Sequence, residues 1–197
     1  MRKIAAHYFL KPDGSWGSKP VISLNEHGVI TEVREMGVAF KEEPGLEFYG
    51  GIIIPGFVED LSILQSSVLE DVIETSRFFN RLFIKGTTRV ILPDCPAARV
   101  YADREKPEVC FRKGTMNQVQ WPSQLAWDKL LGLIGNADSK TFLRILHENT
   151  CAIGQRIQQE KIGVIEPGAR PGLLLLRGVD LESFTPTRNM SIKFLEP

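Results

Sequence analysis

The sequence predicts an α+β fold in which strands from both chain ends belong to one sheet module, with a mainly helical segment inserted between them. Short apolar runs separated by turn residues fill residues 1–55 and 162–197, as expected for strands. Apolar residues at helical spacing dominate residues 56–161. With 43% hydrophobic and 24% charged residues, the chain has enough apolar material to bury a core.

The N-terminal part is predicted to form strands joined by tight turns. Asn25 and Gly28 mark one hairpin turn, since both residue types tolerate a positive φ angle. Gly50 and Gly51 separate two apolar runs, which form either two strands or one bent strand. The predicted strands cover residues 4–10, 21–24, 29–33, 46–49 and 52–54.

Three helices and one strand are predicted in the middle of the chain. Leucine, valine and phenylalanine recur at helical spacing over residues 61–84. Ser123 is the predicted N-cap of the second helix. Asp138 or Ser139 is the predicted N-cap of the third helix, and Gly154 stands where its left-handed C-cap is expected. A strand at 88–92 and an irregular polar stretch at 93–122 lie between the first two helices.

The C-terminal part returns to strands. Short apolar runs at 162–165 and 173–176 are predicted strands, because Pro-Gly turns separate them. Residues 190–195 are predicted to form a final edge strand.

The charge balance excludes several classes of protein. Lys+Arg and Asp+Glu both number 24, so the net charge is zero. A balanced charge argues against nucleic-acid binding through phosphate contacts and against a polybasic membrane surface. No apolar run approaches the roughly 20 residues of a membrane span, and no cleavage site follows the short apolar run near Met1. We therefore expect neither a nucleic-acid partner nor a membrane partner.

The cysteines and histidines show no metal or disulfide pattern. Cys95, Cys110 and Cys151 are odd in number and form no CxxC pair, which indicates reduced thiols and a cytoplasmic location. The three histidines lie far apart and form no HxH or HExxH motif. We therefore expect no metal and no other cofactor.

Two segments resemble motifs of the amidohydrolase superfamily, of the cytosine deaminase and chlorohydrolase type. Residues 50–58 read Gly-Gly-Ile-Ile-Ile-Pro-Gly-Phe-Val, which resembles the lead into that family's first barrel strand. Residues 162–176 contain Gly-Val-Ile-Glu-Pro-Gly before a leucine run, which resembles the C-terminal motif. The resemblance implies a small β-sandwich built from residues 1–55 plus 162–197. It also implies that residues 56–161 are a helical remnant of a (β/α)₈ barrel.

The chain departs from the family pattern at the metal site. In the family, an HxH pair after the Gly-Phe-Val strand holds a metal that activates water. The corresponding positions hold Leu61 and Ile63, whose side chains have no lone pair. The family's metal-binding aspartate, in a Gly-Thr-Asp sequence, matches at best Met116. Residues 56–161 are also fewer than half of the roughly 250 that a full barrel takes. The resemblance therefore implies a truncated relative without the metal site.

Four residues at the ends of predicted strands are candidates for ligand binding. Glu59 and Asp60 follow the first barrel-type strand, and Asp94 and Cys95 follow the second, where barrel enzymes carry function. Glu59 or Asp60 also suits the N-cap of the helix predicted from residue 61, and Cys95 suits an inert turn position. Basic residues between 99 and 113 alternate with acidic ones, which predicts a solvated loop.

Three functional hypotheses follow from these patterns. The first is a catalytically inactive, truncated amidohydrolase-like protein that acts by binding or association, with an unknown small-molecule ligand. The second is a hydrolase with an altered or absent metal site, which uses Glu59, Asp60 or Asp94 with a metal ion or water, since carboxylates hold harder metal ions. The third is an interaction or structural subunit that forms a homo-oligomer, with a dimer expected, and so covers exposed strand edges and the apolar face of the first helix.

Overall fold

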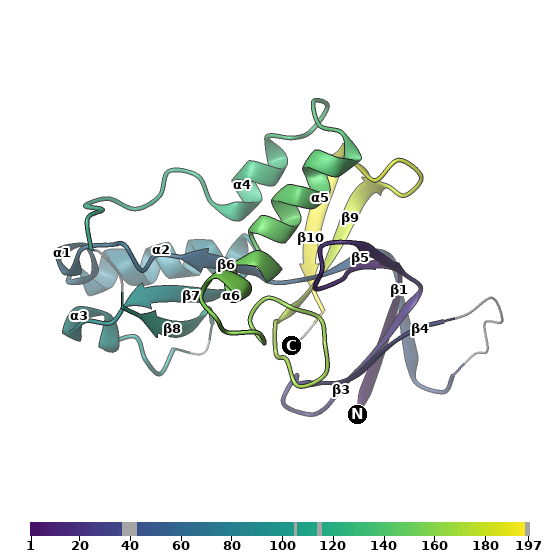
Figure 1. Cartoon of the computed structure of the whole chain (residues 1–197), viewed down its shortest axis with the longest axis horizontal. Coiled ribbons are helices and arrows are strands. Elements are labelled where there is room, and N and C mark those ends of the chain that lie inside the picture. Colours follow the sequence, from purple (N-terminus) through teal and green to yellow (C-terminus); the bar gives the residue numbers. More distant parts are fainter. Residues whose placement is uncertain (37–42, 105, 114–115, 196–197) are drawn as a thin grey trace. The chain divides into compact units, whose positions relative to one another are not determined.

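The computed structural model describes residues 1–36, 43–104, 106–113 and 116–195 (Figure 1). It shows a mixed α/β structure with a sheet of seven strands, a sheet of three strands and a minority of helices. The chain divides into two compact units. One contains Met1–Gly56 and Leu130–Pro197, and the other contains Phe57–Lys129. The domain boundaries expected from the sequence, 1–55 plus 162–197 and 56–161, stay a prediction.

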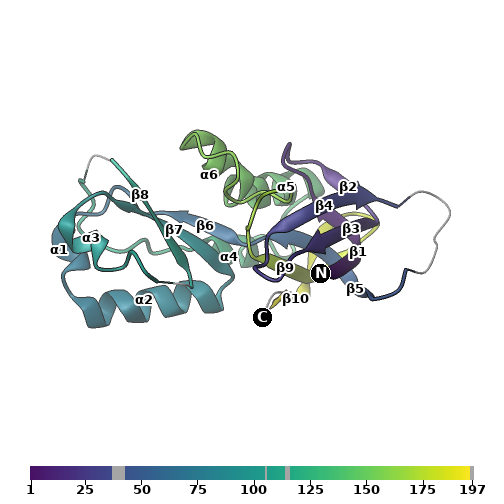
Figure 2. The same cartoon turned by 90° about the horizontal axis from the view of Figure 1, so that it is seen from below.

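The seven-stranded sheet of the first unit takes strands from both ends of the chain (Figures 1 and 2). Its strand order is β10-β9-β5-β1-β3-β4, and β2 pairs with β1. The two chain ends meet where β5 and β9 run antiparallel, with Ile52 opposite Leu176. The two-sheet sandwich is not confirmed, because all seven strands belong to one sheet. The strands are β1 (Arg2–Leu10), β2 (Trp16–Ser18), β3 (Pro20–Leu24), β4 (Ile30–Glu35), β5 (Leu46–Pro55), β9 (Leu173–Asp180) and β10 (Thr185–Phe194).

The central strands of this sheet are buried on both faces. Ile52, Ile53 and Ile54 follow one another in β5 and none is exposed to solvent. A strand covered on both faces has no polar side, which explains its continuous apolar run. One core cluster on this sheet contains Ile4, Ala6, Phe9, Ile22, Leu24, Ile30, Ile53, Ile165, Leu173, Leu175 and Leu195.

Two local predictions in the N-terminal part are settled by the backbone. The turn at residues 25–28 is confirmed: the Asn25 carboxamide accepts the N–H groups of His27 and Val29, both at 2.9 Å. Gly28 there has a φ of 73°. The Gly50–Gly51 segment lies inside a single strand, β5, and its register against β1 shifts there.

The second unit contains a parallel three-stranded sheet covered by helices (Figure 2). Strand β7 lies between β6 and β8 and runs parallel to both. The helix α2 packs Phe78, Phe79 and Leu82 into the core of this unit. The elements are β6 (Phe57–Asp60), α1 (Ser66–Leu69), α2 (Val72–Ile84), β7 (Thr87–Pro93), α3 (Pro96–Arg99) and β8 (Glu108–Arg112).

The continuous helix predicted over residues 61–84 is wrong. Leu61 extends the strand pairing instead, because its N–H donates to the carbonyl oxygen of Ile91 at 2.8 Å. The helical stretch begins only after residue 65, and α2 has its own N-cap, Asp71, whose carboxylate accepts the N–H of Glu74 at 2.9 Å. Leu61 and Leu64 belong to the same core cluster as α2, which explains why they follow its apolar spacing without being helical.

The later helices start and end at other residues than predicted, except at Asp138. The carboxylate of Asp138 accepts the N–H of Thr141 at 2.7 Å and caps α5 as expected. Ser123 is not an N-cap, because α4 begins at Ala126. Gly154 is not a C-cap. It lies within α6, where a Cβ atom would come within 2.4 Å of the Ile162 carbonyl oxygen. The bounds are α4 (Ala126–Leu131), α5 (Ser139–Glu148) and α6 (Cys151–Arg156).

The C-terminal strand predictions are confirmed in part. Residues 173–176 lie in β9, and residues 190–194 lie in β10, the edge strand of the sheet. Residues 162–165 are buried but form no strand. Their burial explains the apolar run that suggested one.

Candidate functional site

The three parallel strands of the second unit bring charged residues to one edge of their sheet. The C-terminal ends of parallel strands lie at the same edge, which is where binding sites of α/β sheets gather. Asp60 ends β6, Asp94 follows β7, and Arg112 ends β8. The Asp94 N–H donates to the Arg112 carbonyl oxygen at 2.9 Å, so these two residues adjoin. This edge is the candidate site.

Asp60 is engaged by its own neighbourhood. Its Oδ1 accepts the Ser62 hydroxyl at 2.7 Å and the Ser62 N–H at 3.2 Å, closing a tight turn after β6. Its Oδ2 lies 3.7 Å from Nη1 of Arg112, which joins the ends of β6 and β8 electrostatically. The Asp60 side chain is only 18% exposed, so this ion pair is shielded more than a surface pair. Asp60 therefore serves the turn and the sheet edge.

Asp94 is also paired within the same segment. Its Oδ1 accepts two hydrogen bonds from Arg99, from Nε at 2.9 Å and from Nη2 at 2.7 Å. The Arg99 guanidinium in turn lies over the Phe111 ring, 4.3 Å from its centre, where a cation is attracted to the π face. Cys95 is 8% exposed and is the N-cap of α3, with Pro96 after it. None of the contacts among the described residues joins the Cys95 thiol to a histidine.

Glu59 is buried and accepts a hydrogen bond from the first residue of a helix. Glu59 is 7% exposed, and its Oε1 accepts a hydrogen bond from the Ala126 N–H at 2.8 Å. It thus caps α4, and not the helix that the sequence predicted from residue 61. Burial raises the pKa of the Glu59 carboxyl, and the Ala126 N–H opposes that rise only partly.

The raised pKa of Glu59 gives a pH-dependent prediction. A carboxyl whose folded-state pKa exceeds its unfolded value contributes fully below the unfolded pKa, and loses that contribution as pH rises through the folded pKa. Glu59→Gln keeps an acceptor for Ala126 but cannot ionise. We expect E59Q to be more stable than the wild type at about pH 8 and equal to it near pH 4. Urea unfolding at both pH values measures this.

The exposed Glu26, whose side chain is 85% accessible, provides the control. Glu26→Gln should leave the free energy of unfolding unchanged at both pH values. An E59Q deficit of the same size at both pH values would contradict a buried, destabilised carboxylate at this position.

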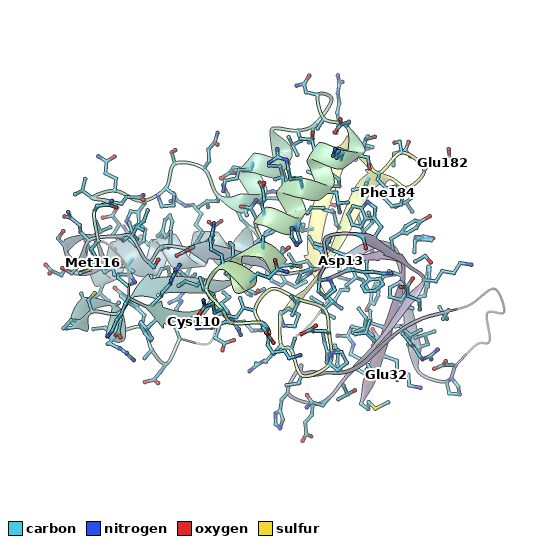
Figure 3. The ribbon with its side chains drawn as sticks, in the orientation of Figure 1. Asp13, Glu32, Cys110, Met116, Glu182 and Phe184 are labelled. Atoms are coloured by element: carbon cyan, nitrogen blue, oxygen red, sulfur yellow. The ribbon has the colours of Figure 1, made fainter. Side chains whose placement is uncertain are left out.

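Leu61, Ile63 and Met116, the positions that the resemblance aligned with metal ligands, differ in burial. Leu61 is 3% exposed and packs in the helix-side core, whereas Ile63 is 43% exposed. Met116 is exposed and follows residues 114–115, which lie outside the described residues (Figure 3). Within the part of the chain that the structure describes, no three His, Cys, Asp or Glu side chains are grouped to hold a metal ion.

Sequence reasoning placed Asp60 and Asp94 at strand ends but missed their partners. Arg99 and Arg112 belong to the stretch predicted as a solvated loop, yet Arg112 ends a strand and both form ion pairs. Their carboxylate partners, Asp94 and Asp60, lie outside that stretch, so the alternation of charges within it does not indicate these ion pairs. Glu59 and Ala126 are 67 positions apart, so no local pattern indicates their hydrogen bond.

A separate pocket lies in the first unit, and its lining contains none of the four predicted candidate residues. It has a volume of about 470 Å³ and is lined by Arg2, His27, Arg170 and neighbours in the turn at 25–28. Arg2 is already bound, because its guanidinium donates to both carboxylate oxygens of Glu47 at 2.7 and 2.8 Å. This hydrogen bonding lowers the pKa of Glu47 to about 2. In the same pocket Nε2 of His27 lies 3.5 Å from Oε1 of Glu26, and Arg170 is a further basic side chain in its lining.

Comparison with known proteins gives only weak likenesses. No family model matches the chain, and no curated protein matches it. Among solved structures, molinate hydrolase is similar over 56% of this chain and 29% of its own, with a TM-score of 0.37 and 16% identity. The N-acetyl-D-glucosamine-6-phosphate deacetylase of Mycobacterium smegmatis is similar over 58% of this chain and 33% of its own, with a TM-score of 0.40 and 14% identity.

A third similar structure is an amidohydrolase from Brucella melitensis, over 46% of this chain and 26% of its own, with a TM-score of 0.29 and 16% identity. This chain spans about a third or less of the length of each of the three structures. The scores and identities are too low to define a shared fold or activity. No helix among the described residues is long and apolar enough to cross a membrane.

Proposed function

We propose that this chain is a non-catalytic, truncated amidohydrolase-like protein that acts by binding or association. The observation that carries the proposal is the chemistry of the residues at the C-terminal ends of β6 and β7. Hydrocarbon side chains stand at 61 and 63, and the adjacent carboxylates of Glu59, Asp60 and Asp94 are each held by a group of the protein itself.

The chemistry of hydrolysis supports this reading. A metal-dependent hydrolase needs electron-pair donors that converge on one ion and lower the pKa of bound water. Here the Asp94 carboxylate accepts both Arg99 donors, and the Glu59 carboxylate stays bound to a helix N-terminus. Freeing Glu59 leaves a buried N–H without its partner, which costs roughly 1–3 kcal/mol. Freeing Asp94 breaks an exposed ion pair, which costs at most about 1 kcal/mol. The arrangement therefore favours structural roles.

The parallel sheet supports the barrel-remnant part of the proposal. Strands β6, β7 and β8 are parallel neighbours in chain order, with helices α1 and α2 between the first pair and α3 between the second. Alternating strands and helices with parallel pairing are the construction unit of a (β/α)₈ barrel. Three such strands are too few to close one. The free thiols at Cys95, Cys110 and Cys151 support a cytoplasmic location.

Metal analysis of the purified chain tests the proposal. Cells are grown with added zinc, nickel and iron, and the full chain is purified without a histidine tag. We expect background metal in the wild type, and the same background in Asp60→Asn and Asp94→Asn. Near-stoichiometric metal that falls in either variant would overturn the proposal.

The second candidate is a hydrolase with an altered metal site. It is favoured by one observation, that Asp60 and Asp94 both lie at the C-terminal edge of adjacent parallel strands. Carboxylates at that edge are where barrel enzymes place their catalytic groups. The metal loss in D60N or D94N described above is the result that would select it.

A further inference from the structure

We propose that two copies of this chain associate edge to edge through β8. The outer edge of β8 in one copy pairs antiparallel with the outer edge of β8 in the other, about a two-fold axis at Cys110. This inference deepens the proposed function, because it names the partner as a second copy and the surface as one strand. Strand β8 is an edge strand: in the described part of the chain it pairs with β7 and with no other strand. Unpaired edges of this kind are natural sites for strand addition.

The backbone phase shows which groups of β8 face outward. The Arg112 carbonyl accepts the Asp94 N–H at 2.9 Å, so the polar backbone groups of Arg112 point toward β7. Backbone groups alternate in direction along a strand, so those of Cys110 also point toward β7. The N–H and C=O groups of Val109 and Phe111 therefore point away from β7, to the open edge.

These outward groups fit a second copy in one register. With the two-fold axis at Cys110, Val109 of one copy lies opposite Phe111 of the other. That pair exchanges two hydrogen bonds, and its symmetry mate exchanges two more. The Cys110 residues then form a non-hydrogen-bonded pair, with Cα atoms about 4.5 Å apart. The valine–phenylalanine pairs are of the β-branched and aromatic type that stabilises sheets.

The charges of β8 select the same register. Glu108 lies opposite the partner's Arg112 at both ends of the paired segment, so each end carries opposite charges. Within one chain Glu108 pairs with Arg89, and Nη1 of Arg112 lies 3.7 Å from Oδ2 of Asp60. The Glu108 and Arg112 side chains are still 47% and 42% exposed, so a second copy can share these charges. Parallel pairing of identical strands in register would place Glu108 beside the partner's Glu108. A two-fold interface is also closed, so it gives a dimer and not a fibre.

Cys110 marks the centre of this interface (Figure 3). It is partly exposed, whereas Cys95 is 8% exposed and Cys151 is fully buried. Cα atoms separated by about 4.4–6.8 Å permit a disulfide, and the predicted separation lies in that range. Cys110 therefore reports the pairing without being needed for it.

A charge-exchange experiment tests the interface in the full chain. The interface is small, so we expect a weak dimer that forms at tens of micromolar in sedimentation velocity. In E108R both ends of β8 are basic, and in R112E both ends are acidic. Each variant alone should dimerise at least about tenfold more weakly, because like charges face each other. An equimolar mixture of the two should regain wild-type association.

The mixture separates loss of folding from loss of pairing. If the variants were unfolded, their mixture would fail to regain association. Circular dichroism of each variant tests whether it is folded. A wild type that stays monomeric at these concentrations overturns the proposal. So does a folded pair of variants that does not recombine, or a wild-type dimer that both substitutions leave intact.

A cross-link gives the register independently. Copper-phenanthroline oxidation of the wild type should yield a disulfide-linked dimer whose linked peptide joins Cys110 to the partner's Cys110. Cys110→Ser should remove the cross-link and keep the sedimentation behaviour. Linkage through Cys95 or Cys151 would overturn the proposed register. Metal found at the sheet edge would overturn the proposed function and leave this dimer untouched, so the two failures are distinguishable.

Discussion

Replacing Phe79 by alanine should lower the free energy of unfolding of the second unit by about 3–5 kcal/mol. Phe79 is fully buried and is among the largest buried side chains of the chain. Its ring contacts Tyr101, at 5.3 Å between ring centres, and Trp121, at 6.4 Å. Removing it leaves a cavity between α2 and the sheet that the neighbouring aromatic rings cannot fill by collapse.

Urea unfolding combined with hydrogen–deuterium exchange of the β7 and β8 peptides measures this loss in the unit concerned. Ile73, on the same helix α2, is 66% exposed and provides the matched control. Ile73→Ala should change the free energy of unfolding by less than about 0.5 kcal/mol. Equal losses in F79A and I73A would contradict the packing of α2 on this sheet.

A second large effect is expected at Gly178 in the first unit. Its φ is +70°, and a Cβ atom there would lie 2.3 Å from the Asn189 carbonyl oxygen and 2.6 Å from the Met190 nitrogen. The clash is with backbone, so no side chain can move aside. Gly178→Ala combines the left-handed cost with overpacking, about 2–4 kcal/mol in total. It should loosen the pairing of β9 with β10, where the register already shifts.

Gly135 separates the two causes. It lies in the same unit and has a φ of +79°, but nothing lies within 4 Å of its would-be Cβ. Gly135→Ala should therefore cost only about 1–2 kcal/mol, the conformational part alone. Thermal unfolding of both variants, with exchange of the β9 and β10 peptides, gives the comparison. If G135A were as damaging as G178A, the close approach of the two strands would be in doubt.

The fold was predictable where local chemistry decides it. The Asn25 turn, the Asp138 cap and the buried run in β5 each depend on residues a few positions apart. The error at residues 61–64 has a tertiary cause, because Leu61 and Leu64 fill the same core as α2 from a non-helical segment. Strand β8 was not predicted, because three of its five residues are charged or weakly apolar. Its strand conformation depends on pairing with β7, which its own sequence does not indicate.

The candidate site was predictable only in its positions. The sequence placed Glu59, Asp60 and Asp94 at strand ends, and the structure keeps them there. Their roles depend on partners that folding brings near. Asp60 meets Arg112 from the third strand, and Glu59 reaches a helix N-terminus 67 residues away. The sequence therefore indicates where these carboxylates lie but not which groups of the protein they contact.

The two units also differ in what they offer for function. The first holds the sheet that joins both chain ends and a pocket whose lining includes Arg170 and His27. The second holds the sheet edge with its paired carboxylates and, on β8, an open strand with self-complementary charges. Association through that strand needs no metal and no catalytic group, in agreement with the proposed function.

The metal content of the chain as purified, determined by mass spectrometry of the intact protein under native conditions, tests the central claim most directly. The account predicts species with the mass of one or two chains of 22.1 kDa and no added metal. A chain that carries one bound metal ion, lost when Asp60 or Asp94 becomes asparagine, would contradict it.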